Sequence, residues 1–471
     1  MDKNAESKKL VDLMAEKRES FINRNKYYYQ ELKRFFDYNI PAGSSVLEIG
    51  CGIGNVLADT KPRRGLGIDM SVEMISIARE KHPELEFMVM DAQKMKINEK
   101  FDFIIISDTI GYFEDVQQFL KSMKAVCHQE TRIIMTYHNF LWAPVLRLAE
   151  ILHIKMPQKR LNWLNKEDLM NLLYLEDYDL IKDGRRLLIP KYIPILSNLA
   201  NRYIGHLPLV NKVCLVNYVI ARVNPDLFNT TQPSVSVIIP ARNEEGNIEN
   251  AIKRMPRIGS HTEIIFVEGN STDNTYQEII RVYKKYKDRY DIKYLKQDGR
   301  GKGDAVRKGF AAAQGDIFMI LDADLTVSPE DLTKFYTAIA SGKGEYINGS
   351  RLVYPMEKEA MRFLNMLANK FFSIMFSWLL GQRLKDTLCG TKVINKANYQ
   401  KLIANRKYFG EFDPFGDFDL IFGSAKLNLK IVEIPIKYRA REYGDTNISR
   451  FTHGWILLKM VAFAMNKIKF I

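Results

Sequence analysis

The stretch Val46–Gly54, with the sequence VLEIGCGIG, is a short apolar run that leads into a turn with three glycines. A run of this kind is typical of a buried strand. Glycines let backbone N–H groups approach a ligand closely, just before a helix begins. Asp69 follows Gly50 by 19 residues and comes directly after the apolar run Leu66–Ile68. In doubly wound folds a carboxylate at this place accepts hydrogen bonds from a ribose diol. The stretch therefore predicts a site for a nucleotide-type cofactor.

Short β-branched runs alternate with helical patterns from about Ser45 to Val223, and the same rhythm restarts at Val235. Alternation of this kind predicts an α/β fold in which helices cover a parallel sheet. The stretch between the two parts is polar and contains Pro225 and Pro233, which is typical of a linker. We expect two domains, residues 1–228 and residues 235–471, joined by a linker at residues 229–234. The strands expected are Gly65–Ile68, Phe87–Met90, Phe103–Ile106 and Arg132–Tyr137 in the first domain, and Val235–Ile239, Ile264–Val267, Ile292–Leu295 and Ile317–Leu321 in the second.

The composition of the 471 residues is that of a globular protein, with 46% hydrophobic and 27% charged residues. It excludes a wholly disordered or collagen-like chain. The formal net charge of +13 favours an anionic partner such as phosphates or an acidic membrane surface. Nucleic acid is a poor candidate, because the basic residues lack the aromatic-interleaved motifs of its readers. The four cysteines form no C-x-x-C pair, so we expect reduced thiols in a cytoplasm. Neither a signal peptide nor a membrane-spanning helix is expected.

The three glycines have the spacing G-x-G-x-G, with Glu48 two residues before the first of them. This pattern resembles the class I S-adenosylmethionine-dependent methyltransferases, whose first motif is E/D-x-G-x-G-x-G. The resemblance extends from about Tyr27 to Tyr137, and it implies a Rossmann-like fold that binds S-adenosylmethionine (SAM). Asp91-Ala92 looks like the adenine-binding position of this family, and Phe101–Asp108 looks like its fourth strand. The cofactor-binding residues that the resemblance implies are Glu48, Gly50, Gly52, Gly54, Asp69, Met70, Asp91, Ala92 and Ser107.

The chemistry implied is the attack of an acceptor atom on the sulfonium methyl group, in which positioning supplies much of the effect. A hydroxyl acceptor would also need a base. His138 is a candidate for this base, although a single histidine after a strand is more often structural. The stretch Ser107–Ile110 contains no N-P-P-Y-type motif, which argues against amino-methylation of DNA or of protein amides. An alternative is that this half binds SAM without turnover and regulates the other half.

Polar and acidic residues follow the predicted strands of the second half, where the ends of parallel strands form a ligand crevice. Ile320–Asp324 (ILDAD) ends in two carboxylates that suit a hard divalent cation bridging a diphosphate. Gly299–Ala305 (GRGKGDA) is a cationic loop suited to phosphates. The other two segments are Pro240–Glu245 (PARNEE) and Glu268–Thr275 (EGNSTDNT).

This ordered set resembles the GT-A glycosyltransferases of family 2, from about Val235 to Tyr443. The resemblance implies that Mg²⁺ or Mn²⁺ binds to Asp322 and Asp324. It also implies that a nucleotide-sugar donor is held by Pro240, Ala241, Asn243, Glu244, Glu268, Asn270, Ser271, Asp273, Lys302, Gly303, Asp322, Ala323 and Asp324.

Three further segments resemble the polyprenyl-phosphate glycosyltransferases, such as dolichyl-phosphate mannose or glucose synthases. They are Asp386–Lys392 (DTLCGTK), Asp417–Leu420 (DFDL) and Arg441–Asn447 (REYGDTN). The mechanism implied is an inverting displacement at the anomeric carbon, in which the metal and Arg441 stabilise the departing nucleoside diphosphate. A lipid phosphate acceptor is already anionic, whereas a hydroxyl acceptor would need Asp417 or Asp419 as its base.

Two of the positions differ from this subgroup. Asn447 replaces its usual lysine, which bears on the contact with the acceptor phosphate. Thr326 stands where the mannose-type members carry a glutamine that binds the metal.

Two segments, Phe363–Leu380 and Trp455–Ile471, are nearly continuous apolar runs. On a helix, the polar residues of the first segment form one narrow stripe, spaced four residues apart from Asn365 to Ser377, beside a broad apolar face. The functional interpretation is a helix that lies on a bilayer, and the alternative is a buried core helix. The second segment adds lysines that can reach the lipid headgroups.

We therefore expect a bifunctional enzyme that is cytoplasmic and peripheral on the inner face of the cell membrane. Its partners would be a nucleotide-sugar donor, a polyprenyl phosphate acceptor and the membrane surface, in the assembly of a cell-surface glycan or glycolipid. The alternative is a SAM-binding regulatory module attached to a glycosyltransferase that acts on a saccharide hydroxyl in solution, with the apolar helices as core or oligomer surfaces.

Overall fold

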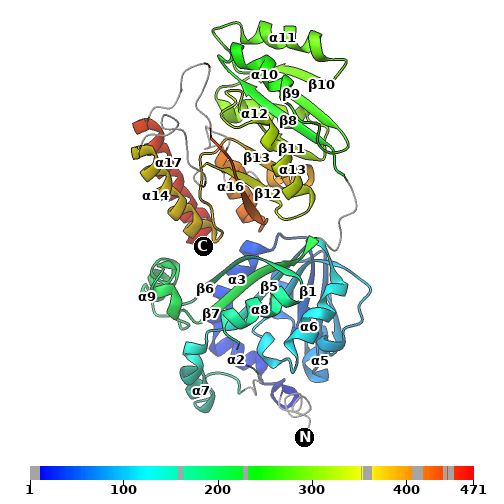
Figure 1. Cartoon of the computed structure of the whole chain (residues 1–471). Coiled ribbons are helices and arrows are strands. Elements are labelled where there is room, and N and C mark those ends of the chain that lie inside the picture. The colour runs from blue at the N-terminus through cyan, green and yellow to red at the C-terminus, as the bar shows by residue number, and fades with distance from the viewer. Residues whose placement is uncertain are drawn as a thin grey trace. The chain divides into compact units, whose positions relative to one another are not determined.

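A computed structural model describes residues 11–157, 162, 164–225, 232–351, 353, 363–405, 417–438, 443 and 450–470. The chain forms two compact units, the first made of Met1–Asn224 with Phe470–Ile471, and the second of Pro225–Lys469 (Figure 1). The predicted linker at residues 229–234 lies partly outside the described residues, since residues 226–231 are not described.

In the described part of the first unit, seven strands form one sheet in the order β3-β2-β1-β4-β5-β7-β6. The pairs from β3 to β5 are parallel, whereas β7 runs antiparallel to both β5 and β6. The bounds are β1 Ser45–Ile49, β2 Arg64–Asp69, β3 Glu86–Val89, β4 Phe101–Ser107, β5 Cys127–His138, β6 Tyr178–Arg186 and β7 Val216–Val223. The four strands predicted in this half are all present.

The helices of the first unit are α2 Arg18–Arg24, α3 Lys26–Asn39, α4 Asn55–Asp59, α5 Val72–Lys81, α6 Val116–Met123, α7 Ala143–Ile151, α8 Lys166–Leu175 and α9 Leu196–Arg202. Among them, α3 and α5 pack on the sheet. Phe35 and Phe36 of α3 and Ile75 of α5 belong to the same apolar core as Val46 and Ile105 of the sheet. Strands that are covered in this way lose the alternation of apolar and polar residues, which is why β1 is buried along its whole length.

In the described part of the second unit, seven strands form a sheet in the order β10-β9-β8-β11-β13-β12-β14. The strands β10, β9, β8 and β11 are parallel, and β13 runs antiparallel to its neighbours β11 and β12. The bounds are β8 Val235–Ala241, β9 Thr262–Glu268, β10 Asp291–Lys296, β11 Ile317–Ile320, β12 Tyr346–Ser350, β13 Lys392–Asn395 and β14 Ile431–Pro435. The predicted α/β fold of both halves is confirmed.

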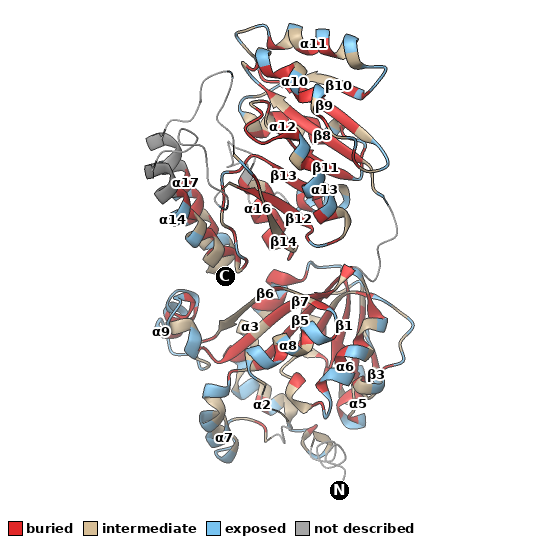
Figure 2. Cartoon of the chain, viewed as in Figure 1, coloured by how far each residue is buried: buried red, intermediate tan, exposed pale blue. Residues whose placement is uncertain are grey.

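The helices of the second unit are α10 Ile248–Lys253, α11 Thr275–Tyr286, α12 Lys302–Ala312, α13 Leu332–Ala340, α14 Phe363–Leu380, α15 Lys396–Ala404, α16 Asp417–Lys426 and α17 Arg450–Ala464. Helix α14 packs its Phe372 and Phe376 into the same core as Met460 and Val461 of α17 (Figure 2). Each helix also keeps large apolar side chains at the surface, namely Phe371, Ile374, Trp455 and Leu458. Both helices therefore contribute apolar side chains to the core and expose others at the surface.

The polar stripe of α14 points into the protein. Asn369 donates a hydrogen bond to Asp386 Oδ1 at 3.1 Å, and the hydroxyls of Ser373 and Ser377 both donate to the carbonyl oxygen of Leu384 at 2.8 and 3.0 Å. Among the described side chains of α14, the exposed ones are the apolar Phe371 and Ile374 and the cationic Lys370. No helix among the described residues combines the length and hydrophobicity needed to cross a bilayer.

The loop before β13 is held by a buried ion pair between Asp386 and Arg351. Two nitrogens of the Arg351 guanidinium donate to the two carboxylate oxygens of Asp386, at 2.7 and 2.8 Å, and the Arg351 N–H donates to the same carboxylate at 3.0 Å. Burial opposes the charge of Asp386, but Arg351 and the N–H donors hold the pKa of this carboxyl below its ordinary value. The pair fixes the loop between α14 and β13 from the end of β12.

We expect Asp386→Asn to destabilise the second unit by about 3–5 kcal/mol, because it leaves the buried charge of Arg351 uncompensated. Urea denaturation, followed through the transition of the second unit, measures this loss. Since the pKa of Asp386 is lowered on folding, its contribution is complete above the unfolded-state pKa of about 4 and disappears as the pH falls through the folded-state value.

The matched control is Asp298→Asn, which removes the partner of Lys308 in a pair whose carboxylate is 84% exposed. Exposed pairs contribute little, so this variant should unfold like the wild type. Equal stability of Asp386→Asn and Asp298→Asn would contradict the structural role of the Asp386–Arg351 pair.

Candidate active sites

The glycine turn of the first unit depends on a left-handed backbone. Gly50, Gly52 and Gly54 have φ angles of +74°, +52° and +78°, which L side chains rarely adopt. A Cβ on Gly50 would lie 2.4 Å from the side chain of Thr109, and a Cβ on Gly54 would lie 2.6 Å from the ring of Phe87. Around Gly52 the space is open within 4 Å, so its backbone faces the cavity directly.

Asp69 closes the turn from the end of β2. Its carboxylate accepts the N–H of Gly52 at 2.9 Å and the N–H of Ser71 at 3.0 Å. Burial raises the pKa of this carboxyl, against the lowering effect of these N–H donors. Asp69 therefore shapes the glycine turn and lies at the cavity wall, where a ribose diol could donate to it.

Glu48 lies in a different environment from the other predicted cofactor residues. Its side chain is buried in β1 beneath the turn, and its Oε2 accepts the N–H of Leu57 in α4 at 2.9 Å. Burial raises its pKa to about 8. The contact with Leu57 holds the start of α4 against the sheet, and Glu48 is not among the residues that line the cavity.

A cavity of about 350 Å³ opens at this edge of the sheet, within the range of about 300–1,000 Å³ that is usual for ligand pockets. The structure brings seven of the nine predicted cofactor residues to its wall, all except Glu48 and Gly54. They are Gly50, Gly52, Asp69, Met70, Asp91, Ala92 and Ser107.

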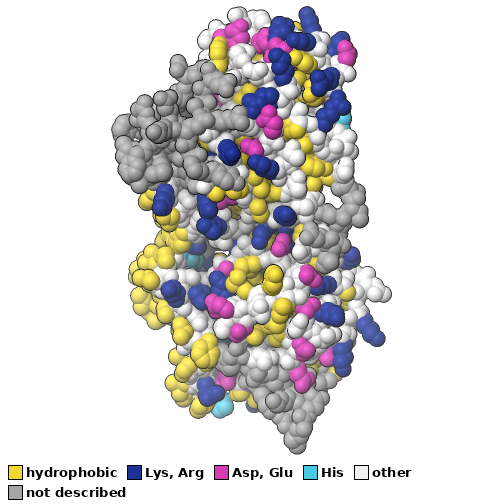
Figure 3. Space-filling view, in the orientation of Figure 1, with side chains coloured by type: hydrophobic (Ala, Val, Ile, Leu, Met, Phe, Trp, Pro, Cys, Tyr) yellow, Lys and Arg dark blue, Asp and Glu magenta, His cyan; other side chains and the backbone are white. Residues whose placement is uncertain are grey.

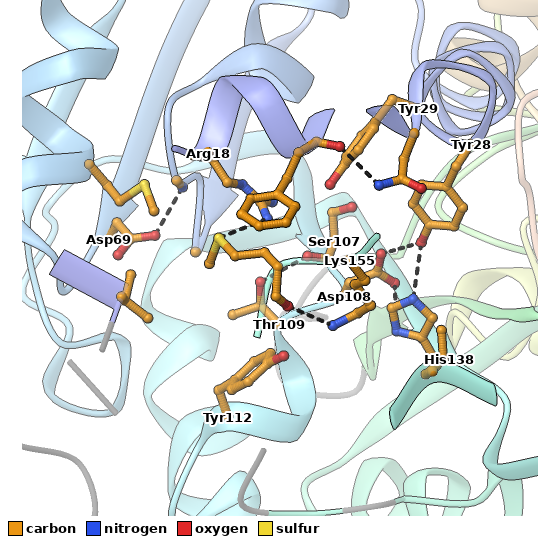
Figure 4. A pocket seen from close by; sticks show the side chains of 18 of the residues that line it. Arg18, Tyr28, Tyr29, Asp69, Ser107, Asp108, Thr109, Tyr112, His138 and Lys155 are labelled. Carbon is orange, nitrogen blue, oxygen red and sulfur yellow. Dashed lines mark hydrogen bonds and ion pairs between the residues drawn. The ribbon is translucent and has the colours of Figure 1, made fainter. Parts of the chain in front are cut away.

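Three side chains gather beyond Ser107, at the same wall (Figure 4). The hydroxyl of Tyr28, from α3, donates to Asp108 Oδ2 and lies 3.5 Å from His138 Nε2. His138 Nδ1 lies 3.9 Å from Asp108 Oδ1. An imidazole beside a carboxylate has the chemistry to accept a proton from an acceptor hydroxyl. Sequence reasoning indicated His138 but missed Tyr28 and Asp108, although Asp108 directly follows β4 at the carboxyl edge of the sheet.

Arg18, from α2, is a cation at the same cavity that the sequence did not indicate (Figure 4). Its guanidinium donates to Met156 Sδ at 3.9 Å, and no carboxylate of the described residues lies within ion-pair distance of it. A carboxylate ligand, such as the amino-acid end of SAM, would therefore complement Arg18. Only the folded chain brings α2 to the carboxyl edge of the sheet.

In the second unit, two neighbouring loops at the ends of β8 and β9 are bonded together. Asn243 Oδ1 accepts the N–H of Thr272 at 2.8 Å, and the N–H of Asn243 donates to Ser271 Oγ at 3.1 Å. Glu268 is buried and accepts the N–H of Ser271 at 2.6 Å. The strand β8 therefore ends beside β9, with the predicted donor-binding residues of both loops at one edge of the sheet.

The predicted metal pair follows β11 at the same edge. Asp322 Oδ1 lies 2.5 Å from Lys302 Nζ, and Asp324 Oδ1 accepts the hydroxyl of Thr326 at 2.8 Å. Burial opposes ionisation of Asp322, but the ammonium of Lys302 and more distant cations hold the pKa of Asp322 below its ordinary value. Thr326 thus positions Asp324, and Lys302 keeps Asp322 ionised.

Gly390 lies directly against this pair. A Cβ at this position would fall 1.8 Å from Asp322 Oδ2 and 2.5 Å from Lys302 Nζ. A side chain at Gly390 would therefore displace the Asp322 carboxylate or the Lys302 ammonium from their present positions. The sequence indicated this segment through its resemblance alone, and the structure gives the physical reason.

The remaining predicted residues of this half are described only in part. Pro240 and Ala241 end β8, Ala323 lies between the two carboxylates, and Gly303 is in the first turn of α12. Glu244 is buried and its N–H donates to Thr275 Oγ1, Asp273 accepts the N–H of Thr275, and Asn270 has a φ of +57°. Asp419 lies on α16, of which Asp417 is the first residue, while the side chain of Asp417 and all of Arg441 and Asn447 lie outside the described residues.

Oxygen ligands from Asp322 and Asp324 have the chemistry that Mg²⁺ or Mn²⁺ prefers. Within the described residues, no group of three or more histidine, cysteine or acidic side chains could hold a metal ion. A divalent cation on this carboxylate pair would therefore need further ligands from a bound donor or from water.

Comparison with known proteins matches residues 236–404 to the glycosyl transferase family 2 and residues 46–130 to a methyltransferase domain. A dolichol-phosphate mannosyltransferase from Pyrococcus furiosus is 30% identical over 222 residues, which are 45% of this chain and 59% of that protein. A dolichyl-phosphate beta-glucosyltransferase from Saccharomyces cerevisiae is 31% identical over 229 residues, which are 43% of this chain and 66% of that protein. The chain thus spans about three fifths to two thirds of the length of these relatives.

A crystal structure of a SAM-dependent methyltransferase from Thermotoga maritima, described as a possible histamine N-methyltransferase, is also similar. The region that matches is 46% of this chain and 99% of the Thermotoga maritima chain, with 15% sequence identity and a TM-score of 0.36. The two family matches, at residues 46–130 and 236–404, assign the halves. The chain carries a methyltransferase domain followed by a glycosyltransferase domain of family 2.

Proposed function

We propose that the chain is a bifunctional enzyme that transfers a methyl group from SAM and a sugar from a nucleotide-sugar donor. Sugar transfer is supported mainly by the close approach of Gly390 to Lys302 and Asp322. This approach brings the segment Asp386–Lys392 to the predicted donor site. The first activity is supported by the cavity that holds both the predicted cofactor residues and the Tyr28–Asp108–His138 cluster.

The acceptor of the sugar is proposed to be a polyprenyl phosphate. The two relatives described above are named for transfer involving dolichyl phosphate. The exposed Phe371 and Ile374 of α14 and Trp455 and Leu458 of α17 give the second unit an apolar surface for the lipid chain. We place the enzyme in the cytoplasm, peripheral on the inner face of the membrane. A saccharide hydroxyl in solution is the alternative acceptor, and a SAM-binding regulatory module is the alternative role of the first half.

For sugar transfer, the loops after β8 and β9 would hold the nucleoside of the donor at the edge of the sheet. Lys302 would exchange its contact with Asp322 for the donor diphosphate, and Thr326 would keep Asp324 oriented. A bound Mg²⁺ or Mn²⁺ on Asp322 and Asp324 would supply charge stabilisation of the leaving diphosphate. An acceptor phosphate is already anionic at neutral pH, so the displacement at the anomeric carbon needs no base from the protein.

For methyl transfer, Asp69 and Asp91 would bind the polar parts of the cofactor, and Arg18 would bind its carboxylate. The glycine turn brings backbone N–H groups close to it without steric conflict. The Asp108–His138 pair would take the proton of an acceptor hydroxyl. These residues position the reactants and accept a proton, which is what transfer from an already activated methyl donor requires.

We expect the full chain to bind SAM in calorimetry and Asp69→Ala to bind it about 5- to 150-fold more weakly, because about 1–3 kcal/mol of charge-assisted hydrogen bonding is lost. Asp37→Asn, on the exposed side of α3, is the control and should bind like the wild type. Absence of SAM binding by the wild type would refute the methyltransferase assignment, and unchanged binding by a folded Asp69→Ala would refute the ribose contact.

We expect sugar transfer to require a divalent metal and both Asp322 and Asp324. A panel of nucleotide sugars with polyprenyl phosphate and Mg²⁺ or Mn²⁺ identifies the donor, and the variant Asp322→Asn with Asp324→Asn should then lose at least about 100-fold in rate. Asp298→Asn, an exposed carboxylate of the same unit, should keep full activity. Full transfer by the double variant in the presence of a chelator would overturn the metal assignment.

A further inference from the structure

The first unit exposes an unusual number of large apolar side chains along two segments, residues 140–154 and 192–213. We call their exposed apolar surface the α7–α9 face (Figure 3). Ile195 is 82% exposed, Leu209 is 79% exposed and Ile151 is 68% exposed. Its members are Phe140, Leu141, Val145, Leu148, Ile151, Leu152, Ile154, Tyr192, Ile193, Ile195, Leu196, Leu199, Tyr203, Ile204, Leu207, Leu209 and Val213.

The two segments form one surface because hydrogen bonds join them. Trp142 Nε1 donates to the carbonyl oxygen of Val213 at 2.8 Å, and Asn139 Nδ2 donates to that of Lys212 at 3.0 Å. At the other end, Asn25 donates to the carbonyl oxygen of Ile154 at 2.9 Å and accepts a hydrogen bond from Lys191 Nζ at 2.9 Å. Apolar surfaces that are contiguous, rather than scattered, mark places where another apolar surface binds.

The charges around this face are all of one sign or are neutralised. From Gly184 to Pro225 the chain has no aspartate or glutamate, while Lys191, Arg202 and Lys212 are exposed. Between Phe140 and Lys155 the only acidic residue is Glu150, which accepts a hydrogen bond from Lys155 Nζ at 2.6 Å. Apolar side chains with a cationic border complement a bilayer that contains anionic lipid headgroups.

The same elements form the wall of the cavity that holds the predicted cofactor residues. Leu146 and Ala149 of α7 line it, while Leu148, Ile151 and Leu152 of the same segment are exposed on the α7–α9 face. Helix α7 therefore has apolar side chains both at the cavity wall and on the exposed face. Lys191 and Lys155, which is paired with Glu150, line the cavity as well, so an amphiphile entering from this face would meet apolar walls and the cation of Lys191.

We propose that the methyltransferase half docks through the α7–α9 face on an anionic lipid bilayer and takes its methyl acceptor from that bilayer. The acceptor is a hydroxyl on the anionic headgroup of a lipid-linked compound. In the transfer, the hydroxyl oxygen bonds to the methyl carbon while the carbon–sulfur bond breaks. Sulfur keeps that electron pair, and the hydroxyl proton passes to the Asp108–His138 pair. This inference rests on the methyl transfer proposed above and adds its substrate class and its docking surface.

The first test places a fluorescent probe on the α7–α9 face of the full chain. Cys51, Cys127, Cys214 and Cys389 are all buried, so a cysteine introduced by Leu209→Cys can be labelled selectively with an environment-sensitive dye. With vesicles of phosphatidylcholine and phosphatidylglycerol, its emission should shift to the blue. The control is Tyr174→Cys, since Tyr174 is 78% exposed on α8 of the same unit and lies outside the face, and its emission should not shift. The probe reports on this face alone, even if the second unit also binds the vesicles.

The second test uses Ile195→Glu with Leu209→Glu, which should weaken partitioning of the full chain onto these vesicles roughly 100-fold, because two apolar side chains no longer enter the bilayer. Tyr174→Glu should partition like the wild type. Methylation of vesicle-borne hydroxyl lipids with labelled SAM should fall with the partitioning, while calorimetric SAM binding stays unchanged. Loss of SAM binding in the wild type would instead refute the proposed methyltransferase function itself.

Three results would overturn the proposal. An unshifted probe at position 209 in the presence of vesicles would show that the face does not meet lipid. A probe that is already shielded without vesicles would show that the face is covered by the rest of the chain, or by a second copy if light scattering reports a dimer. Equal methylation of vesicle-borne lipids by the wild type and by Ile195→Glu with Leu209→Glu would show that the acceptor does not arrive through this face.

Discussion

When helices cover both faces of a parallel sheet, the strands are buried and mostly apolar. Polar side chains then gather mainly at the edge of the sheet where the strands end. Both halves of this chain obey that constraint. In the first unit Asp69, Ser107 and His138 end β2, β4 and β5. In the second, Glu268 ends β9, and Asp322 with Asp324 follows β11. The central parallel strands, such as β4, β8 and β11, are mostly apolar along the rest of their length, so the candidate site residues are concentrated at these edges.

Four carboxyl groups, Asp386 and Glu48 buried and Asp322 and Asp69 partly buried, show how differently the protein can support a charge that is shielded from water. Asp386 is paired with a guanidinium and Asp322 with an ammonium, and the pKa of each is lowered. Asp69 is held by backbone N–H groups that only partly offset its burial, so its pKa is raised. Glu48 has one N–H donor, and its pKa of about 8 leaves it largely protonated at neutral pH. Both of these ion pairs lie in the second unit, and only the pair at Asp322 lies at the predicted donor site.

Both units expose apolar side chains beside basic residues, though they do so by different means. In the second unit a regular helix, α14, turns its polar stripe inward to Leu384 and Asp386 and leaves Phe371 and Ile374 outside. In the first unit the α7–α9 face is built from short helices and loops that end at a cavity. A lipid bilayer would bury the exposed apolar side chains of both units. A lipid-linked acceptor could then reach either site without leaving the bilayer.

Local sequence determined the features that depend on neighbouring residues. The glycine turn after Val46–Ile49, the carboxylate at Asp69 and the pair at Asp322 and Asp324 follow from strand ends and turn chemistry, which act over a few residues. The α/β fold of both halves follows from the alternation of short apolar runs with helical patterns. These features could therefore be predicted without knowing how the elements pack.

Tertiary structure decided the features that depend on residues far apart in the chain. Tyr28 meets Asp108 across 80 residues, and Gly390 meets Asp322 across 68. The periodicity of the sequence showed that α14 has a polar stripe. It did not show that the stripe binds the loop at Leu384, because a helical pattern indicates which residues share a face but not which part of the chain packs on that face. The same holds for residues 192–213, whose apolar side chains have no regular period. Burial depends on the partner that packs against a face, and that partner is specified only when the chain has folded.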